Sequence, residues 1–225
     1  MMKLTLCVPL IWMLFSSAEA LKCVREDNWS HVDSSKDPEL CNSTDTHCAT
    51  VAYRDITNNI LGLYPLVRTC APSSLCDKGD QSISLCYDNT RSTASFQCCS
   101  SDGCNSKVIP TPSKQRPNGL QCVTVSVSDP SEYRTEQCAG IEDRCIIVNA
   151  TDTDGSHVLR GCASASLCEG HTELKLKLVF AHFIPVDKMS FGAPECCDTS
   201  LCNSAPSDKL RVIPLLLALV ALSWR

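Results

Sequence analysis

The cysteines constrain this chain more than any other feature. Its 225 residues contain 18 cysteines, several times the share of an ordinary intracellular protein. The first series after the N-terminal segment is Cys23, Cys41, Cys48, Cys70, Cys76, Cys86, Cys98, Cys99 and Cys104, and the second is Cys122, Cys138, Cys145, Cys162, Cys168, Cys196, Cys197 and Cys202. The two series superpose when Cys86 is set aside. So many cysteines indicate a compartment in which disulfides persist.

Three short spacings recur in both series. One step is seven residues long, at 41–48 and 138–145, and another is six residues long, at 70–76 and 162–168. Each series also ends with two adjacent cysteines, four other residues, and Cys-Asn. The longer intervals between these fixed positions differ. This pattern predicts a repeated domain in which variable loops leave a disulfide hub.

The domain boundary is visible in composition. Residues 107–119 contain three prolines and no cysteine, which is typical of a semi-extended linker. We therefore expect a first domain over residues 21–106, a linker over 107–119 and a second domain over 120–203. The balance of 20 basic and 25 acidic residues gives no reason to expect a nucleic-acid partner.

Both ends of the chain carry apolar segments. Residues 1–20 have a lysine, an apolar run and a small-residue ending, which predicts a cleaved signal peptide. Near the other end, small residues precede a polar spacer and an apolar tail. This order predicts a glycosylphosphatidylinositol (GPI) attachment signal, with Asn203 or alternatively Ser204 as the attachment residue and 204–225 as the removed propeptide. A weak membrane span or plain secretion are the alternatives, although the tail is shorter than the roughly 20 residues of a typical span.

The cysteine pattern also carries a family resemblance. Both halves open with Leu-x-Cys, at Leu21 and Leu120, and close with Cys-Cys-x4-Cys-Asn. With the shared spacings, these motifs resemble the Ly-6/urokinase-receptor domain, and residues 160–168 are similar to a segment of urokinase-receptor and phospholipase A2 inhibitor domains. The resemblance implies an all-β, disulfide-rich fold of two tandem three-finger domains.

The resemblance further implies a disulfide pairing, which spacing alone does not select from the 105 pairings open to eight cysteines. The implied pairs are Cys23 with Cys48, Cys41 with Cys70, Cys76 with Cys98, Cys99 with Cys104, Cys122 with Cys145, Cys138 with Cys162, Cys168 with Cys196, and Cys197 with Cys202. It also suggests that the closing Asn105 and Asn203 hydrogen-bond their hubs. Adjacent cysteines rarely bond each other, so Cys98 and Cys99 should have different partners.

Cys86 has no counterpart in the second series. It leaves an odd number of cysteines in the mature chain, so one thiol must remain outside the internal pairs. A buried or capped thiol is one interpretation. A bridge that makes a dimer and a rearranged local pairing are the others.

The segments between cysteines suggest hairpins and glycan sites. Residues 145–162 hold two β-rich arms around an Asp-Gly turn, and 50–54 with 65–69 suit a similar hairpin. The segment 174–184 alternates and then becomes apolar, which favours a core strand over a ligand surface. The sequons at Asn28, Asn42 and Asn149 can accept N-linked glycan.

The residue pattern offers no catalytic site. The five histidines are scattered and there is no Gly-x-Ser-x-Gly motif. The spacing also lacks the paired Cys-x2-Cys of zinc ribbons. We therefore expect no enzyme activity, no metal and no cofactor. The apolar segment 60–66 makes Ile60, Leu63, Tyr64 and Leu66 the ligand-contact candidates, with packing between fingers as the alternative.

The sequence thus predicts a non-enzymatic, GPI-anchored glycoprotein on the outer leaflet of the cell membrane. Its finger loops would bind an extracellular protein ligand or co-receptor, as the resemblance to the urokinase receptor implies. The alternatives are a soluble inhibitor resembling the phospholipase A2 inhibitors, and an adhesion or gamete-surface protein in which Cys86 bridges two molecules.

Overall fold

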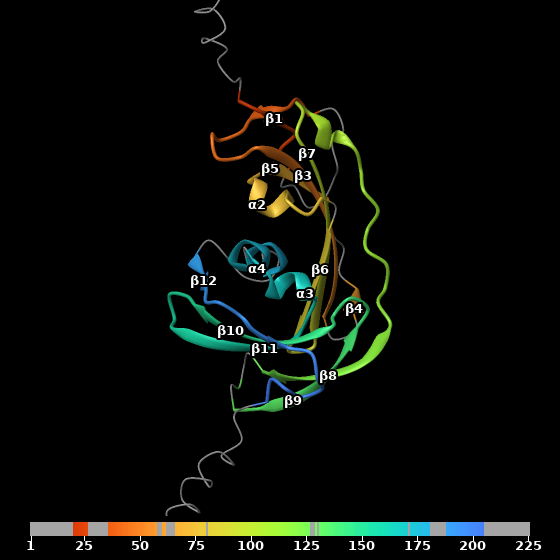
Figure 1. Cartoon of the computed structure of the whole chain (residues 1–225), viewed down its shortest axis with the longest axis vertical. Coiled ribbons are helices and arrows are strands. Elements are labelled where there is room, and N and C mark those ends of the chain that lie inside the picture. The colour runs from red at the N-terminus through yellow and green to blue at the C-terminus, as the bar shows by residue number, and fades with distance from the viewer. Residues whose placement is uncertain are drawn as a thin grey trace, which may run out of the picture.

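A computed structural model describes residues 20–26, 36–57, 60–61, 66–79, 81–126, 129, 131–170, 172–180 and 188–204. These residues form an elongated body of mainly β-structure, with one cysteine cluster near each end (Figure 1). The expectations for the signal peptide, for Asn28 and for the tail after Ser204 lie outside this part of the chain. Among the described residues, no helix has the length and apolar character that crossing a membrane requires.

The first half of the chain is built from strands and two short helical turns. In order these are β1 (Lys22–Cys23), β2 (Glu39–Leu40), β3 (His47–Thr57), β4 (Ile60–Leu61), β5 (Leu66–Ala71), α2 (Ser73–Cys76), β6 (Gln81–Tyr87), β7 (Thr90–Cys99) and the 3-10 turn η1 (Cys104–Ser106). The β3–β5 pairing confirms the predicted first-half hairpin. Asp88 and Asn89 both have positive φ, which suits the tight two-residue turn between β6 and β7.

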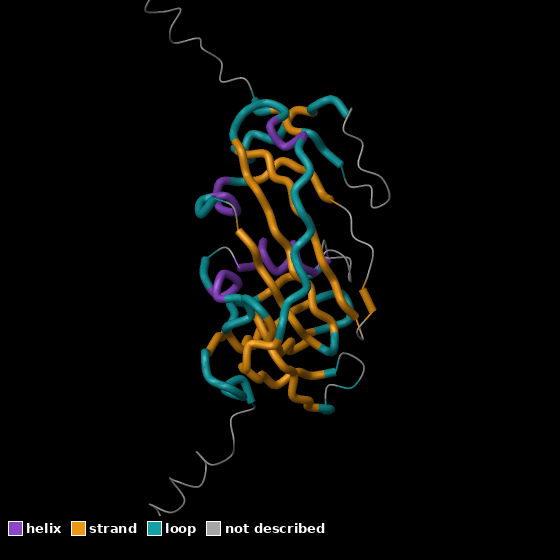
Figure 2. The backbone as a smooth tube through the Cα atoms, turned by 90° about the vertical axis from the view of Figure 1, so that its right-hand side faces the viewer, coloured by secondary structure: helices purple, strands orange, loops and turns teal. Residues whose placement is uncertain are grey.

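The second half repeats the disulfide hub of the first half, but the segments between its cysteines have a different structure. It contains β8 (Pro117–Val125), β9 (Tyr133–Ala139), β10 (Arg144–Thr151), β11 (Ser156–Ala163), α3 (Ala165–Cys168), α4 (Thr172–Phe180), β12 (Ser190–Phe191) and β13 (Glu195–Cys197). Strands β10 and β11 form the predicted hairpin, with Cys145 opposite Cys162. Residues 107–116 form no helix or strand and run alongside the long strands (Figure 2).

One sheet crosses from one half of the chain to the other. Its main path runs β12-β10-β11-β6-β7-β3-β4, with β13 on β10 and β5 on β3. The link is the antiparallel pairing of β11 with β6, where Cys162 lies opposite Cys86 and Ala163 opposite Leu85. The neighbouring Gly161 needs its lack of a side chain, because a Cβ there would lie 1.9 Å from the carbonyl oxygen of Cys86.

The hydrophobic core is also shared. A single cluster of buried side chains contains Tyr53 and Phe96 from the first half with Ile146 and Phe180 from the second. The ring of Tyr87 meets the ring of Phe180 edge to face, with centroids 5.0 Å apart. Burial of apolar surface drives folding, so this common core joins the two halves into one packed unit.

The expected core strand at 174–184 is wrong in its described part. Residues 172–180 form helix α4, and Leu176, Val179 and Phe180 are fully buried. These positions have the i, i+3, i+4 spacing of one helix face. The described part of the segment therefore lies in the core, as predicted, but as a helix and not as a strand. Lys175 lies on another side of the helix, where its Nζ donates to the carbonyl oxygens of Ser166 and Glu169 at the end of α3.

Candidate functional site

Eight disulfides hold the two hubs. The structure joins Cys23 to Cys48, Cys41 to Cys70, Cys76 to Cys98, Cys99 to Cys104, Cys122 to Cys145, Cys138 to Cys162, Cys168 to Cys196, and Cys197 to Cys202. These are the pairs that the family resemblance implies. Two groups of three cysteine sulfurs lie close enough together to hold a metal, but each sulfur is bonded in a disulfide and so offers no thiolate.

An asparagine closes each hub in the same way. The side-chain oxygen of Asn105 accepts from the Val24 N–H at 2.9 Å, and its Nδ2 donates to the carbonyl oxygens of Val24 and Ala49. Asn203 repeats this pattern with the N–H of Val123 at 2.8 Å and the carbonyl oxygens of Val123 and Ile146. Both asparagines are almost fully buried. Each one therefore ties the end of its half to the residue that follows the opening cysteine.

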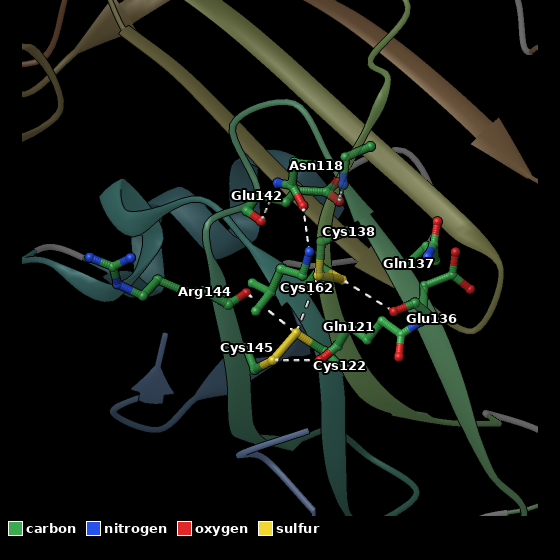
Figure 3. Close-up of a disulfide and its surroundings, with 12 residues drawn as sticks. Asn118, Gln121, Cys122, Glu136, Gln137, Cys138, Glu142, Arg144, Cys145 and Cys162 are labelled. Atoms are coloured by element: carbon green, nitrogen blue, oxygen red, sulfur yellow. Dashed lines mark hydrogen bonds between the residues drawn. A yellow bond between two sulfur atoms is a disulfide. The ribbon is translucent and has the colours of Figure 1, made fainter. Parts of the chain in front are cut away.

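Glu142 lies near the cysteines of the second hub (Figure 3) and belongs to a buried charged network. Glu142 is fully buried, and its Oε1 accepts from Ser84 and from Nε of Arg91, both at 2.8 Å. Its Oε2 accepts from the N–H of Ala139 at 2.9 Å. Burial raises the pKa of the Glu142 carboxyl, while Arg91 acts in the opposite direction. The network joins β6 and β7 of the first half to the β9–β10 turn of the second.

Cys86 is the free cysteine of the described residues, and it is buried. Its exposed fraction is 1%, and its backbone lies in the β6–β11 pairing. Burial raises the pKa of its thiol, and the nearby Glu142 acts in the same direction. A thiol in this position has little thiolate and no access to a second molecule, which favours the buried-thiol interpretation over the bridged dimer.

A groove opens where the second-half hairpin meets the rest of the molecule. It has a volume of about 620 Å³ and is lined by Tyr87 from β6, Phe180 from α4, Tyr133 from β9, and residues 156–160 of β11. Tyr133 is 54% exposed and Val158 46% exposed. A concave, largely apolar site of this size is of the kind that holds ligands.

One end of the groove is acidic. Asp152 and Asp154 of the β10–β11 turn line it. Asp152 accepts from the N–H groups of Asp154 and Gly155, and Nε2 of His157 lies 3.3 Å from its carboxylate. These hydrogen bonds, that from Asp154 first, lower the pKa of Asp152. The carboxylate therefore stays charged well below neutral pH.

Sequence reasoning missed the groove residues, and the two predicted contacts that the structure describes, Ile60 and Leu66, do not line the groove. Ile60 is 72% exposed on β4. Leu66 is buried against Ala52 and Ile109, so it supports the finger from inside. Leu63 and Tyr64 are outside the described residues. The β-rich arms around the Asp-Gly turn indicated the β10–β11 hairpin, but nothing in the sequence placed the edge of β11 beside Tyr133.

The predicted modification sites occupy different environments. Asn42 and Asn149 are both exposed. Asn203 is 1% exposed, and Nη1 of Arg160 donates to its carbonyl oxygen. The next residue, Ser204, is exposed.

Comparison with known proteins gives relatives of two kinds. The urokinase plasminogen activator surface receptor of Mus musculus is 28% identical over 133 residues, which cover 56% of this chain and 38% of the receptor. The phospholipase A2 inhibitor gamma subunits B of Elaphe climacophora and Elaphe quadrivirgata are each 32% identical over 109 residues, covering 45% of this chain and 54% of the subunit.

The chain thus spans about half or less of the length of these relatives, and no family model matches it. Its eight disulfides nevertheless fit the three-finger domain, and its strands fit an all-β, disulfide-rich fold. These homologues belong to the Ly-6/urokinase-receptor superfamily of three-finger proteins, and the disulfides of this chain fit the domain of that superfamily.

Proposed function

We propose that this protein is a non-enzymatic, GPI-anchored cell-surface glycoprotein that binds an extracellular protein ligand. The groove between β11, β9 and Tyr87 carries the proposal, because it combines exposed apolar side chains with a charged end. Tyrosines such as Tyr133 are common at the energetic centres of protein interfaces. The names of the relatives, a surface receptor and an inhibitor subunit, describe proteins that act by binding.

The rigid union of the two halves supports this role. The groove takes Tyr87 from the first half and most of its remaining wall from the second. The shared sheet and core fix these parts relative to one another. A preformed site loses less conformational entropy on binding than one that must be assembled.

For the lipid anchor, Ser204 is the attachment residue that the geometry favours. Attachment requires an enzyme to reach the peptide bond that follows the chosen residue. The side chain of Asn203 is occupied in the hub, whereas Ser204 is exposed. Asn42 and Asn149 are the glycan sites that we propose within the described part, because both are exposed.

The binding role is tested with the full chain purified from mammalian cells and immobilised. It is probed with a panel of tagged, multivalent extracellular proteins, and a reduced and alkylated sample serves as the control. We expect one or a few panel members to bind the oxidised protein alone. Binding of none, or equal binding to the reduced sample, would remove the support for this function.

The anchor is tested on intact cells that express the full chain. Phosphatidylinositol-specific phospholipase C should release the protein from the cell surface into the medium. Protein that appears in the medium without lipase would favour the second candidate, a soluble inhibitor, which the 32% identity to phospholipase A2 inhibitor subunits supports.

A further inference from the structure

Strand β11 is paired unequally on its two sides. On one side it pairs with β10 along its whole length, from Ser156 opposite Thr151 to Ala163 opposite Arg144. On the other side, within the described part of the chain, β6 pairs only with Cys162 and Ala163. Strand β6 ends at Tyr87, where the chain turns into β7. Residues 156–160 thus form a strand edge with which no described strand is paired, although β8 and β9 pack near β11.

The hydrogen bonds between β11 and β6 show which backbone groups of β11 point toward the unpaired edge. The N–H of Ser164 donates to the carbonyl oxygen of Ser84, so it points toward β6. Backbone groups of successive residues in an antiparallel strand point alternately to its two sides. The β10–β11 register has no bulge. The N–H and C=O groups of Arg160 and Val158 therefore point to the same side as those of Ser164.

The groove runs along this edge. All five residues from Ser156 to Arg160 line it. Side chains alternate between the faces of a strand, so a cavity over one face would touch only every second residue. Contact with five in succession requires a cavity that borders the edge and reaches both faces. Unpaired strand edges accept further strands, and natural proteins usually cover or charge them.

The walls of the groove indicate what it accepts. Tyr87 and Met189 lie on its interior side with the fully buried Phe180 behind them, and Val125 and Tyr133 lie on the side of the β8–β9 hairpin. Both faces of an added strand would thus meet apolar surface. A strand that continues the direction of β6 runs antiparallel to β11, and its C-terminal end comes to Asp152 and Asp154. Opposite charge at that end improves association.

We propose that the groove binds its ligand by strand addition: an extended segment of a partner protein, apolar in its centre and basic at its C-terminal end, pairs with residues 156–160 of β11. This inference rests on the proposed binding function and names the form of the ligand. Main-chain hydrogen bonds to Val158 and Arg160 supply affinity, and the apolar walls and the acidic end select the sequence.

The test uses a peptide probe and the full chain purified from mammalian cells. The probe is a short peptide of alternating valine and threonine with lysines at its C-terminal end. Its matched control has the same sequence with N-methyl groups on its central amides, which preserve charge and side chains but remove the N–H donors. We expect the probe to bind and the control to bind at least about tenfold more weakly, because the control cannot donate main-chain hydrogen bonds to the carbonyl oxygens of Val158 and Arg160.

Two variants at one position separate backbone from side chain. Val158→Pro removes an N–H that points away from β10, and proline is tolerated where that group is outside the ladder. Val158→Ala keeps the N–H and removes only methyl groups. Val158→Pro should abolish probe binding, whereas Val158→Ala should weaken it by less than about tenfold. Hydrogen–deuterium exchange should show that the Val158 and Arg160 amides are protected by the probe in the wild type.

The outcomes distinguish this inference from the function on which it rests. Strand addition would be overturned by equal binding of both peptides, or by an absence of probe-induced protection at Val158 and Arg160. A partner found in the protein panel would still support the binding function. A dimer that Val158→Pro dissociates would also overturn it, because the edge would then pair with a second copy. If Val158→Pro fails to fold, the comparison of the two peptides on the wild type decides alone.

Discussion

Arg91 of β7 donates from Nε to Oε1 of Glu142 at 2.8 Å, across the boundary between the two halves of the chain. The Glu142 side chain is fully buried and that of Arg91 is 18% exposed. Glu142 also accepts from Ser84 and Ala139. The Glu142 carboxylate thus accepts hydrogen bonds from both halves of the chain.

The first prediction concerns this ion pair. Glu142→Gln and Arg91→Met should each destabilise the protein by about 2–4 kcal/mol, because each removes the nearest opposite charge from a largely desolvated partner. The double variant should cost less than the sum of the two single changes. Denaturant unfolding with intact disulfides measures these differences.

The control is the pair Lys177–Glu173 on the surface of α4, whose side chains are 34% and 53% exposed. Removal of that pair should cost no more than about 0.5 kcal/mol. Additive effects at Arg91 and Glu142 would mean that the two residues act independently.

The second prediction concerns the closing asparagines. Asn105→Asp and Asn203→Asp replace a donor NH₂ with an oxygen that faces two carbonyl oxygens. Each should lower stability by about 2–3 kcal/mol or reduce secretion, because it loses hydrogen bonds and places like partial charges together. Secreted yield and thermal unfolding report the effect. Gln97→Glu, an amide-to-acid change at an exposed position of β7, should have none.

The third prediction is a pH dependence centred on Asp55. Its side chain is fully buried opposite Ser92, and burial raises the pKa of its carboxyl from 3.8 to about 6. The folded state therefore binds a proton more tightly than the unfolded state. The stability supplied by the protonated form is complete below about pH 3.8 and is lost as pH rises to about 6.

Asp55→Asn should accordingly raise the free energy of unfolding at pH 7.5 by about 1–3 kcal/mol and flatten its fall between pH 4 and 6. The exposed Asp198→Asn is the control, and it should do neither. The free energies of unfolding of the wild type and of Asp55→Asn could instead differ by the same amount at every pH in this range. That result would count against a buried, proton-binding carboxyl.

The fourth prediction concerns Cys86. In the native protein its thiol should resist a maleimide reagent, and it should react fully in denaturant. On a non-reducing gel the protein should run as a monomer. A dimer that Cys86→Ser abolishes would show that the thiol reaches a second molecule, contrary to its 1% exposure.

Much of the fold could be predicted from the repeated cysteines. Fixed spacings located both hubs, and the family resemblance supplied the pairs that the structure contains. The hairpin at 145–162 was also predictable, because β-rich arms flank an Asp-Gly turn. These features depend on contacts within a short stretch or on a motif that repeats.

The joining of the halves could not be predicted in this way. The β6–β11 pairing depends on the close approach permitted at Gly161, which pattern alone does not reveal. The segment 174–178 alternates like a strand, yet Lys175 donates to the end of α3, Lys177 pairs with Glu173 on the surface, and the leucines reach the core from a helix. The groove arises from this long-range packing, so its lining residues carried no sequence signal.

The groove, and not the tip of the first-half finger, should hold the protein ligand. Once the panel gives a partner, its dissociation constant should be measured with Tyr133→Ala and with Ile60→Ala, two truncations of exposed apolar side chains. Tyr133→Ala should weaken binding by about ten- to a hundredfold, or about 1.4–2.8 kcal/mol, and Ile60→Ala should leave it unchanged. The reverse result would place the ligand on β4 and rule out the groove as its site.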